Sequence, residues 1–123
     1  MSSKVSEQTE AVLLHHLQAF GEGDVDEILS DYTEDSVLLL PDATARGPDE
    51  MRALFTTFVT EIIPPGSDFQ MSKQAVEGEV AYIVWSSSSP NYDVPLGTDT
   101  FIVRDGKIML QTFAGQIIPK NTS

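Results

Sequence analysis

Two adjacent histidines, His15 and His16, and one aspartate, Asp99, are the side chains of this sequence best suited to move protons. The apolar residues of the first predicted helix form one arc when turned by about 100° per residue, and His16 lies at its centre. We therefore expect His16 to be buried and His15 to lie in solvent, titrating near the usual value of about 6.5. A buried histidine can exchange protons with a ligand, or it can simply be a packed core residue.

Asp99 shares one face of a predicted strand with Phe101 and Val103, because successive side chains of a strand point to opposite sides. If that face points inward, burial of a lone carboxylate is costly. Asp99 must then be protonated or bonded to a donor such as His16 or Tyr32. The alternative is an aspartate at a strand edge in water. We expect His16 and Asp99 to face one pocket and to be electrostatically coupled.

Four other side chains could reach such a pocket. Asp42 follows Pro41, which ends a predicted strand, and could act as a base at the pocket mouth or simply make a turn. Trp85, Tyr82 and Tyr92 could line a cavity for a flat apolar ligand. Trp85 could equally fill the core or a dimer interface.

Several classes of site are excluded by what the sequence lacks. Adjacent histidines point to different faces of a helix, and no cluster of histidine and carboxylate recurs at ligand spacing, so no metal is predicted. The chain has no cysteine, which excludes disulfides, thiolate metal sites and a cysteine nucleophile. No glycine-rich phosphate loop or nucleophile elbow is present. We expect no cofactor.

The chain is strongly acidic, with 19 Asp and Glu against 7 Lys and Arg and a net charge of −12. Such a charge repels a phosphate backbone, so nucleic acid is not an expected partner. We attribute the acidity to a solvated surface and keep a site for a cationic ligand as the lesser alternative. The longest apolar run, 37–41, is far shorter than the ~20 residues of a membrane span. With no secretory signal at the start, we expect a cytoplasmic protein that does not enter the membrane.

The elements that must position these side chains change character half-way along the chain. The first half predicts three amphipathic helices and one buried strand, and the second half alternates with period two, which is typical of strands. The Asp105-Gly106 pair favours a tight hairpin turn. The predicted helices cover 5–20, 24–31 and 47 to the prolines at 64–65, and the predicted strands cover 37–40, 69–77, 80–85, 98–103 and 107–114, with a loop at 86–91.

Helices followed by consecutive strands predict one α+β domain over 1–123, with a core over about 5–118, in which helices pack on one face of a curved sheet. A curved sheet closed by helices leaves a pocket. Some strands carry apolar residues on both faces, so we also expect a homodimer through the outer face. The predicted pocket-lining residues are Leu40, Phe55, Phe58, Trp85, Phe101 and Phe113.

Four segments resemble the nuclear transport factor 2-like superfamily, which includes SnoaL-like and ketosteroid isomerase-like proteins. They are residues 20–24, 32–37, 47–55 and 101–108. The resemblance extends over 5–116 and implies a cone-shaped, cystatin-like fold with three helices packed on a curved, mostly antiparallel sheet. It implies little about function, because this fold carries isomerases, cyclases, dehydratases, epoxide hydrolases and transport adaptors.

Compared with ketosteroid isomerase, the position of the catalytic base falls on Leu40, which cannot accept a proton, and that of the oxyanion tyrosine falls on His16. The position of the protonated acid matches Asp99. Tyr32 matches a supporting tyrosine, and Phe55 replaces another. The resemblance therefore implies altered chemistry, without ketosteroid isomerisation.

Two functions remain open. One is a cofactor-free enzyme that acts on a small apolar carbonyl or hydroxyl compound, with His16 and Asp99 as proton donor or acceptor and Tyr32 in support. The other is a pocket that binds a small hydrophobic ligand, or only a dimerisation module, without chemistry. Leu40 favours the second function, and the pair of His16 and Asp99 favours the first.

Overall fold

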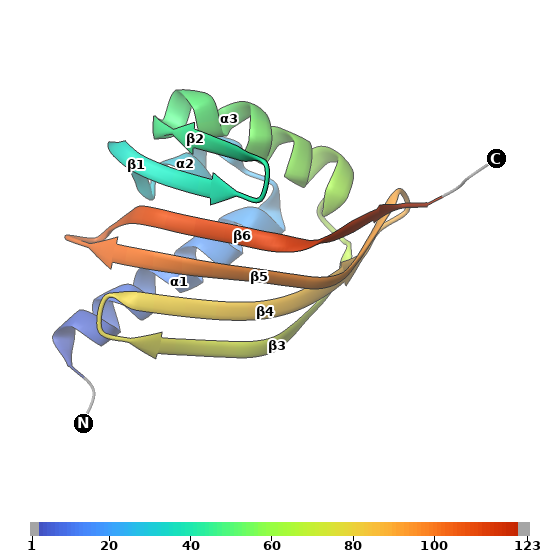
Figure 1. The fold of residues 1–123 in the computed structure, drawn as a ribbon. Coiled ribbons are helices and arrows are strands. Elements are labelled where there is room, and N and C mark those ends of the chain that lie inside the picture. The colour runs from blue at the N-terminus through green and yellow to red at the C-terminus, as the bar shows by residue number, and fades with distance from the viewer. Residues whose placement is uncertain (1–2, 121–123) are drawn as a thin grey trace.

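The computed structural model describes residues 3–120 as three helices packed on one six-stranded sheet (Figure 1). The helical elements are α1 (Lys4–Glu22), α2 (Val25–Leu29), α3 (Gly47–Thr57) and the π-helical turn η1 (Phe58–Ile62) that continues α3. The strands are β1 (Tyr32–Leu40), β2 (Ala43–Arg46), β3 (Asp68–Glu77), β4 (Val80–Ser88), β5 (Tyr92–Arg104) and β6 (Lys107–Pro119).

The ends of α1 follow local capping rules. The Ser3 side chain accepts a hydrogen bond from the Ser6 amide at the N-terminus, which satisfies one of the free amides there. Gly23 ends the helix with a φ of 68°, a left-handed conformation that glycine adopts without steric cost. The N-terminal turns of α1 also hold the β3–β4 turn, because the Thr9 hydroxyl donates to the Gly78 carbonyl at 2.6 Å.

The strands lie in the order β2-β1-β6-β5-β4-β3. Neighbours are antiparallel except β1 and β6, which are parallel and join the first half of the chain to its end. Asp105 and Gly106 both have positive φ, 54° and 76°, as a primed two-residue turn requires. The predicted hairpin between the last two strands is confirmed.

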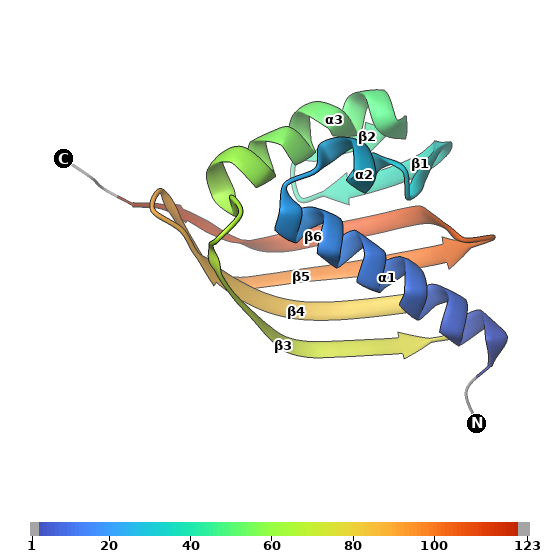
Figure 2. The same ribbon diagram turned by 180° about the vertical axis from the view of Figure 1, so that it is seen from behind.

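All helices lie on one face of the sheet, and the described helices leave the opposite face uncovered (Figures 1 and 2). The predicted α+β class, with helices on a curved, mixed sheet, is confirmed, although the sheet is not closed. Apolar side chains from the inner face of the sheet and from α1 and α3 form one core. Within residues 3–120, no helix is long and apolar enough to cross a bilayer.

The element boundaries differ from the sequence prediction in several places. The short strand β2 was not predicted, because its four residues show little apolar alternation. The predicted loop at 86–91 is shorter, since β4 continues to Ser88 and pairs with the start of β5. The residues added to β4 at 86–88 are all serines, so ladder hydrogen bonds rather than a hydrophobic pattern define this part of the strand. The first helix extends slightly beyond its predicted bounds of 5–20, because α1 runs from Lys4 to Glu22.

Candidate functional site

A cavity of about 240 Å³ lies between the inner face of the sheet and the helices α1 and α3. Its walls are mainly aromatic and aliphatic, and its polar side chains include His16, Asp99 and Gln111. The structure therefore places both proposed proton-exchanging residues on one cavity. The six side chains predicted to line a pocket, Leu40, Phe55, Phe58, Trp85, Phe101 and Phe113, also lie on its wall.

Asp99 points inward from β5 and is buried. Its Oδ1 accepts a hydrogen bond from Trp85 Nε1 at 2.8 Å, and its Oδ2 accepts one from Gln111 Nε2 at 2.9 Å. The two donors come from β4 and β6, the strands on either side of β5. Burial raises the pKa of Asp99 to about 6, although both hydrogen bonds favour the carboxylate and limit the shift.

Gln111 links Asp99 to Tyr32. The Tyr32 hydroxyl donates a short hydrogen bond to Gln111 Oε1, so the amide carries the connection from β1 to β5. Burial raises the pKa of Tyr32 well above its usual range, and the negative charge of Asp99 adds to the shift. Tyr32 therefore supports Asp99 through Gln111 and not by direct contact. Sequence reasoning missed Gln111, although period two places it on the same face as Phe113.

His16 is buried among aromatic rings. Its ring centroid lies 5.0 Å from that of Phe20 and 5.2 Å from that of Phe101. The His16 Nδ1 is buried without a hydrogen-bond partner, and the nearest carboxylate oxygen, Asp31 Oδ2, is 3.9 Å away. Burial, together with the smaller effect of the neighbouring His15, lowers the pKa of His16 to about 3. The Asp31 carboxylate, which is hydrogen-bonded to His15, is not among the causes of this shift.

The expected pairing of His16 with Asp99 is not found. The donors to Asp99 are Trp85 and Gln111, and no hydrogen bond or ion pair joins His16 to Asp99 among the described residues. The causes of the His16 pKa are burial and His15, and Asp99 is not among them. The two residues line one cavity without a hydrogen bond or ion pair between them, and neither is among the causes of the other's pKa shift, so the predicted electrostatic coupling has no support.

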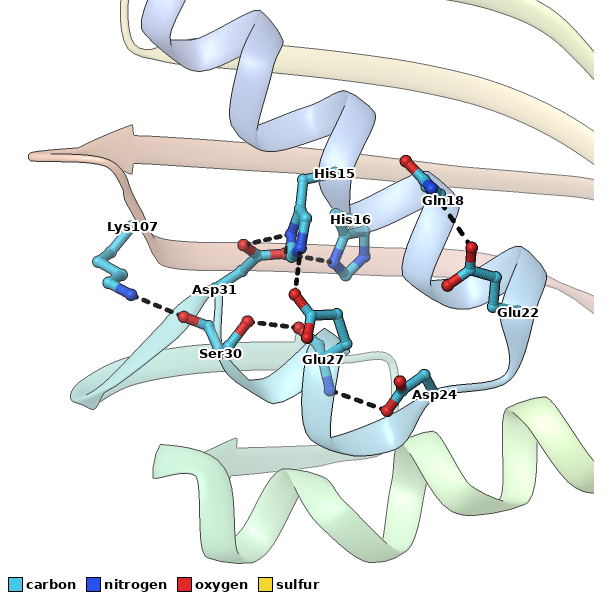
Figure 3. Close-up of polar contacts among 9 residues, drawn as sticks. All are labelled: His15, His16, Gln18, Glu22, Asp24, Glu27, Ser30, Asp31 and Lys107. Atoms are coloured by element: carbon cyan, nitrogen blue, oxygen red, sulfur yellow. Dashed lines mark hydrogen bonds and ion pairs between the residues drawn. The ribbon is translucent and has the colours of Figure 1, made fainter.

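His15 is not the free surface residue that the sequence predicted (Figure 3). Its Nδ1 lies 2.8 Å from Asp31 Oδ1, and its Nε2 lies 2.7 Å from Glu27 Oε1. These carboxylates raise the pKa of His15, Asp31 more than Glu27. The prediction of an ordinary pKa is therefore wrong. The pKa of Asp31 is also raised, because burial of its carboxyl group outweighs the bond to His15.

Three side chains that the sequence offered as possible pocket residues do not line the cavity. Asp42 is exposed in the β1–β2 turn and does not line the cavity, so it makes the turn that its position after Pro41 favoured. Tyr82 lies on the outer face of β4, because its neighbours Ala81 and Ile83 point inward. Tyr92 begins β5, away from the cavity wall.

The model of a SnoaL-like domain matches residues 13–111 of this sequence, which include α1 from Leu13 and most of the sheet. The chain belongs to the SnoaL-like domain family. Among curated proteins, none matches the sequence. The matched span contains His16, Tyr32, Asp99 and Gln111, so the polar side chains of the cavity all lie inside the SnoaL-like domain.

Solved structures share the fold of this SnoaL-like domain at low sequence identity. An NTF2-like protein of unknown function from Mesorhizobium loti has a TM-score of 0.78 and 22% identity, covering 94% of this chain and 97% of that one. A putative ketosteroid isomerase from Kribbella flavida has a TM-score of 0.75 and 15% identity, covering 96% and 84%. An LEH-like epoxide hydrolase from M. tuberculosis has a TM-score of 0.71 and 16% identity, covering 90% and 84%. At such identities the likeness establishes the fold alone.

Within residues 3–120 of the SnoaL-like domain, no group of three or more histidine, aspartate or glutamate side chains is arranged to hold a metal ion. Asp99 can accept a proton near neutral pH, and the neutral imidazole of His16 can donate or accept a hydrogen bond.

Proposed function

We propose that this SnoaL-like domain binds a small, mostly apolar molecule in its cavity, with Asp99 as the polar group that orients the ligand. The observation that carries the proposal is a carboxylate buried on an otherwise largely apolar wall. Ligand sites typically combine apolar surface with a few convergent polar groups whose pKa values are perturbed. A volume of about 240 Å³ lies below the roughly 300–1,000 Å³ of common drug-sized sites, which favours a small ligand.

The same groups would carry acid–base chemistry if the bound molecule reacts. The pKa of Asp99, about 6, is suited to proton exchange near neutral pH, and this observation favours the enzymatic alternative. In that case His16 and Asp99 would exchange protons with the ligand, and Tyr32 would hold Asp99 in place through Gln111. The position of the base in ketosteroid isomerase falls on Leu40, so an isomerase, cyclase or dehydratase reaction of this cavity would use Asp99 as its base.

The single tryptophan makes ligand binding measurable, since Trp85 lines the cavity and bonds to Asp99. We would titrate the protein with indane, 1-phenylethanol, 1-phenylethylamine and phenylacetic acid and follow Trp85 fluorescence. We expect a saturable change with at least one of these neutral, basic and acidic probes. No saturable change with any probe would contradict the proposal.

Two neighbouring residues of β1 give a matched pair of variants. Leu40 lines the cavity, whereas Leu39 is 39% exposed on the opposite face. Leu40→Phe adds volume inside the cavity and should weaken binding severalfold, because a packed site has little room for a larger ring. Leu39→Phe adds the same atoms outside and should leave binding unchanged. Equal effects of the two substitutions would place the ligand elsewhere.

We also propose that the protein forms a homodimer through the outer face of the sheet. Val80 and Tyr82 of β4 are 40% and 36% exposed, and the described helices all lie on the other face (Figure 1). Apolar surface of this kind favours a partner. Sedimentation should give a dimer at micromolar concentration and a monomer for Tyr82→Glu, whereas a monomeric wild-type protein would refute the dimer. The cytoplasmic location remains a prediction from the sequence.

A further inference from the structure

Within residues 3–120, the carboxylate of Asp99 accepts hydrogen bonds but has no positively charged partner. Both of its donors, Trp85 Nε1 and Gln111 Nε2, are neutral. No lysine or arginine is among the residues that line the cavity. A buried carboxylate without a counter-ion retains much of its desolvation cost, so a positively charged group in the cavity would be strongly favoured.

The second polar group on the cavity wall is also an acceptor. The buried Nδ1 of His16 faces Asp31 Oδ2 at 3.9 Å (Figure 3). A lone pair on Nδ1 would be repelled by the negative charge of that carboxylate. The neutral imidazole of His16 therefore carries its proton on Nδ1 and its lone pair on Nε2. In this tautomer Nε2 of His16 is a hydrogen-bond acceptor, in addition to the carboxylate of Asp99. The donors beside Asp99 are already directed at its oxygens.

The rings around the cavity are suited to a cation as well. Aromatic rings line the cavity on several sides, among them Phe20, Phe55, Phe58 and Phe113. The faces of aromatic rings attract cations, and they do so more strongly where water is excluded. The net charge of −12 also raises the concentration of cations near the protein.

We infer that the cavity takes a small apolar amine, bound as its ammonium ion against Asp99. The inference rests on the proposed function, because it names the class of ligand for the same cavity. An alcohol would satisfy the acceptors but leave the charge of Asp99 uncompensated. A ketone would direct a third acceptor at Asp99 and His16, and a carboxylate would add a second negative charge.

Three probes with one carbon skeleton separate these cases: 1-phenylethylamine, 1-phenylethanol and acetophenone. At pH 7.5, Trp85 fluorescence should give a dissociation constant for the amine at least about tenfold lower than for the alcohol or the ketone, as expected for a charge-assisted hydrogen bond. Equal or tighter binding of the alcohol or the ketone would overturn the inference and leave the proposed function standing. If none of the three bound, the inference would be overturned, and the proposed function itself would fail only if indane and phenylacetic acid did not bind either.

Two variants that each remove one carboxylate test whether Asp99 is the cause. Asp99→Asn should abolish the preference for the amine while the alcohol still binds. Asp35→Asn removes an exposed carboxylate of β1 and should leave the preference unchanged. A preference that survives Asp99→Asn, or that is lost equally in both variants, would overturn the assignment to Asp99.

A pH titration of the wild-type protein gives the same test without a substitution. The groups that face Asp99 are His16 from α1, Tyr32 from β1, Trp85 from β4 and Gln111 from β6. None of these four changes charge between pH 7.5 and 5. With an Asp99 pKa of about 6, the amine should bind roughly tenfold more weakly at pH 5, and the alcohol should not change. Amine binding that is constant over this range would contradict the inference.

Discussion

Replacement of His16 by phenylalanine should make the protein less sensitive to acid. In the folded protein His16 has a pKa of about 3, against an ordinary value of 6.5. Between these values the unfolded chain binds a proton that the folded protein does not. The free energy of unfolding therefore falls as pH falls from 6.5 towards 3. A phenylalanine at this position cannot bind the proton in the unfolded chain, and its ring can pack among the surrounding rings of Phe20, Phe55 and Phe101.

The size of the effect follows from the two pKa values. At pH 4.5 the unfolded histidine is two pH units below its ordinary pKa, and each unit corresponds to about 1.36 kcal/mol. Between pH 7 and 4.5 the wild-type protein should therefore lose roughly 2.5 kcal/mol more stability than His16→Phe. This is a large share of the ~5–15 kcal/mol that stabilises a typical domain.

Urea unfolding followed by Trp85 fluorescence at both pH values measures the difference. Every other titrating group, Asp99 and His15 included, is present in both proteins, so subtraction isolates the contribution of His16. His16→Leu provides a second variant should the larger ring not fit. If wild-type protein and both variants lost the same stability between pH 7 and 4.5, His16 would not be a buried neutral imidazole. The tautomer argument for the cavity would then fail with it.

Four further outcomes are expected. Because the carboxylates beside His15 raise its pKa, its stabilising effect is complete below pH 6.5 and is lost as pH rises through the folded value. The loss of Tm in His15→Gln should accordingly be largest in acid, and an effect that grows above pH 7 would contradict this sign. A Cβ on Gly97 would lie 2.6 Å from the indole of Trp85, so Gly97→Ala should cost about 1–3 kcal/mol and shift the fluorescence. Gly21→Ala meets no atom within 4 Å inside α1 and should instead stabilise the protein by about 0.5–1 kcal/mol in the same urea assay. Finally, with Leu40 at the position of the base, the protein should not convert a β,γ-unsaturated ketosteroid, and measurable conversion that Asp99→Ala abolishes would show another base.

The periodicity of apolar residues along single helices and strands was enough to predict much of the cavity wall. The helical arc put His16 on the inner side of α1, and alternation along the strands put Asp99 and Phe113 on the inner face of the sheet. These positions depend only on which way successive side chains point in one helix or strand, and a short stretch of sequence is enough to show that. The division of the chain into helices and then strands likewise predicted the layer arrangement.

The partners of the polar groups could not be predicted in this way. Trp85 and Gln111 reach Asp99 only because three strands pair in a particular register, and that register shifts at irregularities after Trp85 and after Ile102. The same limit applies to His15, whose partners are the carboxylates of Glu27 in α2 and of Asp31, two residues after the end of α2. Their approach depends on how α2 packs against α1, which no local pattern encodes.

The parallel pairing of β1 with β6 bears on how the chain folds during synthesis. The four strands from β3 to β6 join consecutive neighbours and can assemble as successive hairpins. In contrast, β1 pairs Val37 with Leu110, so the first half of the chain has no sheet to join until β6 has left the ribosome. Until then, α1, β1 and α3 expose the apolar side chains that later line the core, such as Leu13, Leu38 and Met51. A nascent chain of this protein is therefore most prone to aggregation, and most dependent on chaperones, just before its last strand emerges.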